Sequence, residues 1–334
     1  MCISEQDLVT AAVGIVVIGR NEGERLIRCL KSISGLVGHV VYVDSGSSDG
    51  SVEAAHKLGV TVVELDLRTP FTAAQARNAG FKRLLELEPR FEYVFFVDGD
   101  CEVYEGWLNN ALQFLGGHRD VAIVCGRRRE RYPERSIYNT LCDIEWGSYP
   151  IGETKSCGGD AVARVDAFRQ VNGYRPELIC GEEPDLCARL RQKGWRIWHL
   201  DVDMTLHDAA IYRFGQWWKR MLRGGYASAQ GAALHGDPPA LHWVKESRRA
   251  WVWGLYIPVT ALLLAFVVGW WGLLLLGVYP IQWIRLACRA RRFTRANWLW
   301  AGAMVVGKFP ELLGQIRFLL DRYRHANSRL IEYK

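Results

Sequence analysis

The run Tyr93-Val94-Phe95-Phe96-Val97-Asp98-Gly99-Asp100 is the most informative stretch of this chain. Its first five residues are apolar, aromatic or β-branched, which is typical of a buried strand. Asp98 and Asp100 follow at the C-terminal end, where open α/β sheets bind their ligands. Two carboxylates this close repel each other unless a cation joins them, and Mg²⁺ or Mn²⁺ prefers oxygen ligands. The alternative is a solvated Asp-Gly turn.

Strand-like and helical stretches alternate on both sides of this run. Strands are predicted at 14–18, 39–43, 60–65 and 93–97, and helices at 24–33, 51–58 and 73–87. Further candidate strands lie near 121–125, 157–165 and 196–200. This alternation predicts an α/β fold with a mixed, mostly parallel sheet and flanking helices.

Composition narrows the classes of partner and the compartment. The 334 residues carry a net charge of +6, with arginines concentrated at 127–135 and 285–295. No arginine-rich tail or known nucleic-acid motif accompanies them, so a membrane surface or a phosphorylated substrate is favoured over nucleic acid. The nine cysteines form no Cys-x-x-Cys pair. This spacing favours a reducing compartment and implies neither zinc nor disulfides.

A long uncharged segment predicts attachment to a membrane. The 35 residues between Arg249 and Arg285 contain no Lys, Arg, Asp or Glu. One straight helix of this length would measure about 52 Å, against about 30 Å for a bilayer core. The stretch Gly269-Trp270-Trp271-Gly272 lies in the middle and predicts a turn, hence two spans at 251–268 and 272–288. Arginines on both flanks place both ends in the cytoplasm.

Two alternatives stay open for this segment: a single tilted span with an interfacial extension, or a buried hairpin in a soluble protein. Tryptophans and basic residues interleave from 212 to 226, which is typical of an interfacial helix, and 297–324 reads as amphipathic. The predicted organisation is an α/β domain at 1–208, amphipathic interfacial helices at 209–250, a transmembrane hairpin at 251–288 and a basic amphipathic tail at 289–334.

Two further loops follow predicted strands. The stretches 19–23 and 44–50 are rich in Gly, Ser and acids, so backbone amides can approach a ligand there and carboxylates can bind hydroxyls. Taken singly, each loop is also a common helix cap. Neither is a Gly-x-Gly-x-x-Gly fingerprint, so a nicotinamide cofactor is not supported. Together with Asp98-Gly99-Asp100, they predict a pocket for a nucleotide diphosphate and a metal ion.

With these motifs in place, the chain resembles the family 2 glycosyltransferases over about residues 12–208. The motifs that match, in the family's order, are 17–22, 43–50, 75–80, 97–100, 158–161 and 181–187. The resemblance implies the GT-A fold, which is related to the Rossmann fold. It also implies inverting transfer of a sugar from a nucleotide-diphosphate donor with Mg²⁺ or Mn²⁺.

The resemblance also implies roles for individual residues. Asn21, Glu22, Asp44, Arg77 and Asp98 would hold the UDP-like donor, and Asp100, His207 and Asp98 would hold the metal ion. Many relatives carry a second Asp that reads uracil, where this chain has Ser45, so the base is not fixed. Glu183 would be the catalytic base, with Glu182 as the alternative. The alternatives are purely structural roles. Glu182 and Glu183 would then only stabilise the N-terminus of a helix, and His207 would be a polar histidine in a loop.

The expected protein is a hexosyltransferase-type enzyme of polysaccharide or cell-envelope biosynthesis. Its catalytic domain would lie on the cytoplasmic face of the inner membrane, attached in a multi-pass or monotopic way, with a lipid-linked glycan as acceptor. A processive polysaccharide synthase is an alternative, but Gln216 to Arg220 matches the Gln-x-x-Arg-Trp motif only loosely. A non-catalytic membrane scaffold or sugar-sensing module is the other.

Overall fold

The computed structural model describes residues 12–66, 72–238, 240–289 and 294–324. The chain forms two compact units. The first comprises Met1–Arg131 and Glu145–Ala209, and the second comprises Tyr132–Ile144 and Ala210–Lys334. Of the predicted tail at 289–334, residues 290–293 and 325–334 lie outside the described ones.

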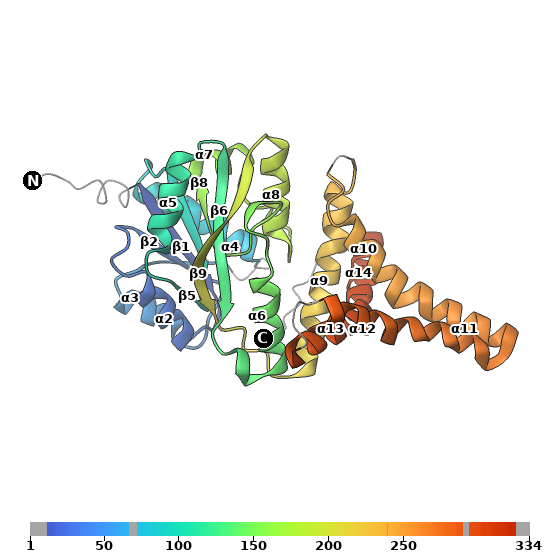
Figure 1. Cartoon of the computed structure of the whole chain (residues 1–334). Coiled ribbons are helices and arrows are strands. Elements are labelled where there is room, and N and C mark those ends of the chain that lie inside the picture. Colours follow the sequence, from blue (N-terminus) through green and yellow to red (C-terminus); the bar gives the residue numbers. More distant parts are fainter. Residues whose placement is uncertain (1–11, 67–71, 239, 290–293, 325–334) are drawn as a thin grey trace, which may run out of the picture. The chain divides into compact units, whose positions relative to one another are not determined.

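The first unit is built on one sheet, whose strands run in the order β3-β2-β1-β4-β8-β6-β9-β5, with β7 pairing to β9 (Figure 1). The strands are β1 (Val13–Gly19), β2 (Val40–Asp44), β3 (Thr61–Glu64), β4 (Tyr93–Asp98), β5 (Cys101–Val103), β6 (Val121–Glu130), β7 (Gly152–Thr154), β8 (Ala161–Arg164) and β9 (Arg196–His207).

The sheet is mixed, as predicted. Pairing is parallel across β3-β2-β1-β4 and between β6 and β9. It is antiparallel where β8 meets β4 and β6, and where β5 and β7 meet β9. Residues Val13 to Ile18 of β1 are buried without interruption, which is the pattern of a strand covered on both faces.

Helices of the first unit flank the sheet (Figure 1). They are α2 (Glu24–Ser32), α3 (Ser51–Lys57), α4 (Ala73–Leu87), α5 (Trp107–Gly117), α7 (Val165–Gln170) and α8 (Glu182–Gln192). The N-terminus of α4 is capped by Thr72, whose hydroxyl accepts the Gln75 N–H at 3.1 Å. This cap fixes the start of the helix that carries Arg77.

The predicted elements of the first 100 residues are present, with ends within two residues of the predicted ones. Further along, the lengths differ. β8 is shorter than the predicted strand at 157–165, whereas β6 and β9 extend beyond Cys125 and Leu200 to Glu130 and His207. The extension of β9 matters for the site, because it pairs His207 directly with Cys101 of β5.

The second unit consists of helices. They are α9 (Phe214–His235), α10 (Val244–Trp251), the π-helix η2 (Val252–Tyr256), α11 (Ile257–Val268), the 3₁₀-helix η3 (Gly269–Gly277), α12 (Val278–Arg289), α13 (Arg295–Val306) and α14 (Lys308–Tyr323), together with the 3₁₀ turn η1 (Pro133–Arg135). Helix α6 (Ile137–Gly147) begins in this unit and ends in the first. Tyr226 of α9 packs edge-on against Phe318 of α14, with ring centroids 5.4 Å apart.

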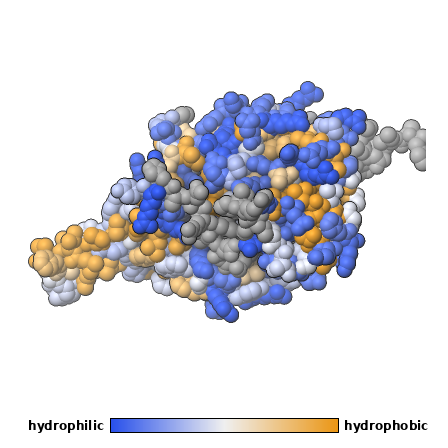
Figure 2. Space-filling model, turned by 180° about the vertical axis from the view of Figure 1, so that it is seen from behind, coloured by the Kyte–Doolittle hydropathy of each residue, from blue (hydrophilic) through white to orange (hydrophobic). Residues whose placement is uncertain are grey.

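The uncharged segment reverses direction at Gly269, which ends α11 with φ +71°. Glycine is favoured there because other residues are strained at positive φ. The two legs bear exposed apolar side chains, among them Leu262, Leu263 and Phe266, and the hairpin is the orange arm in Figure 2. By length and composition, Val244–Arg289 is a helical stretch that could cross a membrane. The two membrane spans remain a prediction.

Candidate active site

The loops after β1, β2 and β4 lie at one edge of the sheet, because these strands are parallel neighbours whose last residues are in register. Side chains tie the first two loops together. The Asn21 N–H donates to the Ser47 hydroxyl at 2.8 Å, and the Ser48 N–H donates to Asn21 Oδ1 at 2.8 Å. Asn21 adopts φ +54°, which its short polar side chain tolerates.

Asp44 organises the second loop. Its carboxylate accepts the Tyr42 hydroxyl and the Gly46 N–H, each at 2.8 Å, and both the N–H and the hydroxyl of Ser47, at 2.7 and 2.5 Å. Asp44 is only 1% exposed. Glu22 forms an ion pair with Arg25 at 2.8 Å. The donor-binding roles of Asp44 and Glu22 remain predictions.

A single buried guanidinium joins three acids. Arg77 Nη2 donates to Asp98 Oδ1 at 2.8 Å, Nη1 donates to Glu182 Oε1 at 3.0 Å, and Nη1 lies 3.3 Å from Glu183 Oε1. The Arg77 side chain is 2% exposed. A Cβ at Gly159 would lie 2.5 Å from Asp98 and 2.6 Å from Arg77, so a larger residue there would displace this pair of side chains. Arg77 therefore links the acid that ends β4 to the acids that begin α8.

The two acids of α8 differ in environment. The Glu182 side chain is 5% exposed and makes the shorter bond to Arg77, whereas Glu183 is 16% exposed. Burial, and then the charge of Glu182, raise the pKa of Glu183 to about 7, although Arg77 acts in the opposite direction. A carboxyl with this pKa can accept a proton near neutral pH.

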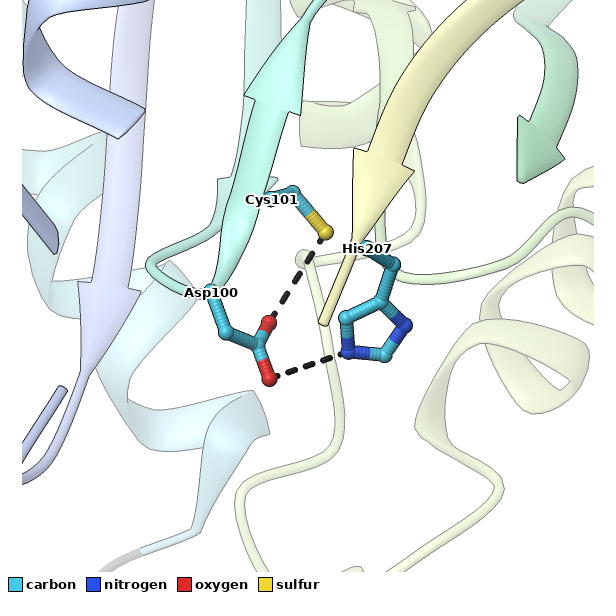
Figure 3. Close-up of side chains that lie close together, drawn as sticks. All are labelled: Asp100, Cys101 and His207. Atoms are coloured by element: carbon cyan, nitrogen blue, oxygen red, sulfur yellow. Dashed lines mark hydrogen bonds and ion pairs between the residues drawn. The ribbon is translucent and has the colours of Figure 1, made fainter. Parts of the chain in front are cut away.

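Asp100 and His207 meet at the same edge (Figure 3). His207 Nε2 lies 2.9 Å from Asp100 Oδ2, and both side chains are buried. The ring of Trp146 stacks on His207 with centroids 4.6 Å apart. Carboxylate oxygen and imidazole nitrogen are donors that divalent cations accept, so these residues fit a metal site. Cys101 Sγ belongs to the same group, whose ligand atoms all lie within 4.8 Å of one another.

Asp98 lies beside this group but keeps different neighbours. Its ligand atom groups with those of Cys101 and Asp160. Its carboxylate pairs with Arg77, and its backbone N–H donates to Asp160 Oδ1 at 2.9 Å. The predicted role of Asp98 as a further ligand of the metal ion remains a prediction.

The structure adds an ion pair between the half-buried Arg128 and the buried Asp160, which was not predicted from the sequence. Arg128 Nη2 lies 2.8 Å from Asp160 Oδ2 and 3.7 Å from Asp98 Oδ2. Burial disfavours ionisation of Asp160, but Arg128, the Asp98 N–H and the Thr205 hydroxyl outweigh it, so the pKa of Asp160 is lowered. The motif Gly158-Gly159-Asp160 indicated Asp160. Arg128 belongs to the arginine-rich stretch at 127–135, but its pairing with Asp160 was not predicted, and no sequence pattern indicated Trp146.

Two further arginines, Arg127 of β6 and Arg131 directly after that strand, are also paired within the first unit. Arg127 pairs with Asp203 at 2.8 Å and with Asp201, and Arg131 pairs with Glu102. The arginine-rich stretch of β6 is thus part of an ion-pair network. Its charges compensate acids of β5 and β9 and those beside the site.

The arrangement of strands and helices is the GT-A fold of glycosyltransferases. The mannosyltransferase PcManGT from Pyrobaculum calidifontis, solved with GDP-Man and Mn²⁺, superposes with a TM-score of 0.63 at 20% sequence identity, covering 93% of this chain and 88% of that one. The predicted fold is thereby confirmed.

Residues 14–172 match the model of "Glycosyl transferase family 2", so this part of the chain is a family 2 glycosyltransferase domain. The pre-mycofactocin glycosyltransferase of Mycobacterium tuberculosis is 29% identical over 68% of this chain, and the match spans about half (49%) of its own length. The succinoglycan biosynthesis protein ExoA of Rhizobium meliloti is 26% identical over 60% of this chain and 64% of its own length. The family predicted from the motifs is confirmed.

Proposed function

We propose that this protein is an inverting glycosyltransferase that moves a sugar from a nucleotide-diphosphate donor to a lipid-linked glycan at the membrane. One observation carries the proposal: Arg77 connects Asp98, at the donor edge of the sheet, to Glu183, a carboxyl whose pKa of about 7 suits a general base. The domain's family and the named activities of its relatives support it.

In this mechanism the loops after β1 and β2 bind the nucleotide through Asn21 and Glu22 and through the amides that Asp44 orients. Glu183 removes the proton from the acceptor hydroxyl as that oxygen attacks the anomeric carbon on the side opposite the leaving diphosphate. Arg77 holds Glu183 next to Asp98, so the base is already positioned before the reaction and little conformational freedom is lost on reaching the transition state. Glu182, more tightly held by Arg77, raises the proton affinity of Glu183.

Asp100 and His207 would hold the divalent ion, with Asp98 beside them. When bound, Mg²⁺ or Mn²⁺ supplies positive charge to the leaving diphosphate. Mn²⁺ accompanies GDP-Man in the structure of the mannosyltransferase PcManGT. Because this chain has Ser45, the identity of the donor's nucleotide base is not determined. Both UDP- and GDP-sugars therefore belong among the donors to test.

The hairpin supports a membrane-associated acceptor. From Arg249 to Gly269 the first leg is about 30 Å long, and the 3₁₀ and α-helical return to Arg285 measures about the same. This equals the thickness of a bilayer core. Trp270 and Trp271 at the turn would then lie at the far interface, where tryptophan is enriched. A catalytic domain tethered in this way meets lipid substrates at high effective concentration.

A donor panel tests the proposed function. Purified full-length protein is incubated with isotope-labelled UDP- and GDP-sugars, membranes as acceptor and Mn²⁺. We expect label from one donor to enter the lipid fraction, and to remain soluble with the Glu183→Gln variant. Failure of every donor, both in transfer to lipid and in slow donor hydrolysis, would contradict the proposal and favour a non-catalytic module.

The pH dependence of turnover reports on Glu183. Because only the deprotonated carboxylate can act as base, we expect kcat/KM to fall about tenfold per pH unit below a midpoint near 7. The rate should level off above that midpoint. A profile that is flat down to pH 5 would show that a carboxyl with an ordinary pKa, or no carboxyl, limits the reaction.

The hairpin can be tested in the full-length protein. Leu262 and Leu263 are 64% and 62% exposed and lie near the middle of the first leg. Aspartate at both positions should release the protein from membranes into the soluble fraction, because each charge at the centre of a span costs about 2.5–3.5 kcal/mol. A reporter fused after Lys334 should be active only in the cytoplasm.

Leu58→Asp is the matched control, because Leu58 is an exposed leucine (43%) in the first unit. This variant should remain in the membrane fraction. A double aspartate variant that fractionates like the wild type would rule out insertion of the hairpin, and a periplasmic reporter would indicate a single span.

A further inference from the structure

Cys101 has no role in the function proposed above, yet its Sγ belongs to both groups of possible metal ligands at the site. One group also contains Asp100 and His207, and the other contains Asp98 and Asp160. Cys101 is fully buried, and its Sγ is 3.8 Å from Asp100 Oδ1 (Figure 3). In β5 it pairs directly with His207 of β9, across an antiparallel ladder. Directly opposed residues of such a ladder point their side chains to the same face of the sheet. The strand pairing thus presents the thiol and the imidazole together.

We propose that Asp100, Cys101 and His207 form a mixed oxygen, sulfur and nitrogen site that selects Zn²⁺, or another thiophilic divalent cation, over Mg²⁺ and Mn²⁺. The ligand atoms lie within 4.8 Å of one another. Zinc bonds of about 2.0–2.3 Å would draw them slightly closer, and three protein ligands leave a fourth position for water or a phosphate oxygen. Binding forms a zinc–sulfur bond and releases the thiol proton to solvent, with no change of oxidation state.

The choice of ion follows from the donor set. Mg²⁺ and Mn²⁺ favour oxygen and gain little from a thiolate, whereas Zn²⁺ accepts all three donor types. The neighbouring group of Asp98, Cys101 and Asp160 is a poorer site. Asp98 is already paired with Arg77, and Asp160 with Arg128, and both guanidiniums would repel an added cation. We therefore expect the Cys101 thiol to bind a metal ion together with Asp100 and His207.

A consequence for turnover rests on the proposed function. If Asp100 and His207 hold the catalytic ion, Zn²⁺ competes with it for the same two ligands and inhibits sugar transfer. The spacing of the cysteines in the sequence gave no indication of this site, because the three ligands come from the start of β5 and the end of β9.

Cobalt is a spectroscopic probe for the thiolate. Metal-free, full-length protein in detergent is titrated with Co²⁺ alone, and then with Zn²⁺. We expect a near-ultraviolet thiolate-to-cobalt band that saturates at about one equivalent and is abolished by Zn²⁺. Cys101→Ser should lose the band. It should also bind Zn²⁺ at least about tenfold more weakly, because even the loss of a residue that only hydrogen-bonds to a metal ligand usually costs that much affinity. Mn²⁺ affinity should change less than about threefold.

Cys125→Ser and Cys288→Ser are the controls, one a buried cysteine of β6 and the other an exposed cysteine of the hairpin. Both should keep the band. A band that survives in Cys101→Ser, or its absence in the wild type, would overturn the proposal. Should Cys101→Ser melt at a lower temperature, His207→Gln serves instead, and an unchanged Zn²⁺ affinity in it would also overturn the proposal. No sugar donor is present, so failure of the donor panel leaves this test intact.

Discussion

Asp100→Ala is expected to reduce sugar transfer by about three orders of magnitude or more while leaving the fold intact. The substitution removes a buried carboxylate that meets His207 at 2.9 Å in the candidate metal site. Without this ligand the leaving diphosphate loses several kcal/mol of charge stabilisation, and each 1.36 kcal/mol is a factor of ten in rate. Transfer is measured with and without EDTA, together with the affinity for Mn²⁺.

Asp201→Asn is the control, since Asp201 is an exposed carboxylate of β9 that pairs with Arg127. It should change transfer by less than about twofold, because exposed ion pairs contribute little. If neither EDTA nor Asp100→Ala lowers the rate, the reaction does not depend on a metal ion at this site. Near-normal Mn²⁺ affinity in Asp100→Ala would likewise place the ion elsewhere.

The strands that surround the donor edge could be predicted from the sequence because their residues are apolar without interruption. β1, β2 and β4 are of this kind, and the polar residues that follow them mark their ends. The convergence of Asn21, Asp44 and Asp98 then follows from parallel pairing. One local pattern was sufficient to predict each strand, and the pairing of the strands in the sheet then brings the loops together.

The end of β9 could not be predicted in the same way. Asp201 and Asp203 alternate there with Val202 and Met204, and these acids after the mostly apolar run 197–200 resemble a polar loop. The strand continues because it pairs with β6 on one side and, over its last three residues, with β5 on the other. Strand β5 itself is only three residues long. The partnership of His207 with Cys101 depends on this long-range pairing, which no local pattern records.

Arg77 shows a different limit of the sequence. The motif at 75–80 marked it as a donor-binding residue, and that role remains a prediction. In the structure its side chain is 2% exposed and bonded to acids from two other elements. Spacing identifies a residue type that the site requires, but only the fold determines which partners satisfy its charge. The same holds for Arg128, whose partner Asp160 lies immediately before β8, in a separate part of the chain.

Glu183→Gln is expected to lower turnover by about two to four orders of magnitude, the usual contribution of a general base. Glutamine keeps the size and the hydrogen-bonding shape of the side chain but cannot accept the proton. Donor binding, measured by calorimetry with the nucleotide sugar, should change little, so the loss falls on kcat rather than on KM. The residual rate should also lose its dependence on pH near 7.

Glu182→Gln is the matched comparison, because both acids bind the same nitrogen of Arg77 and stand side by side at the start of α8. Removing the charge of Glu182 removes one cause of the raised pKa of Glu183. The pH midpoint of kcat/KM should therefore move below 7, while the plateau rate falls far less than in Glu183→Gln. A larger loss of plateau rate in Glu182→Gln, with the midpoint unmoved in that variant, would assign the base to Glu182 instead.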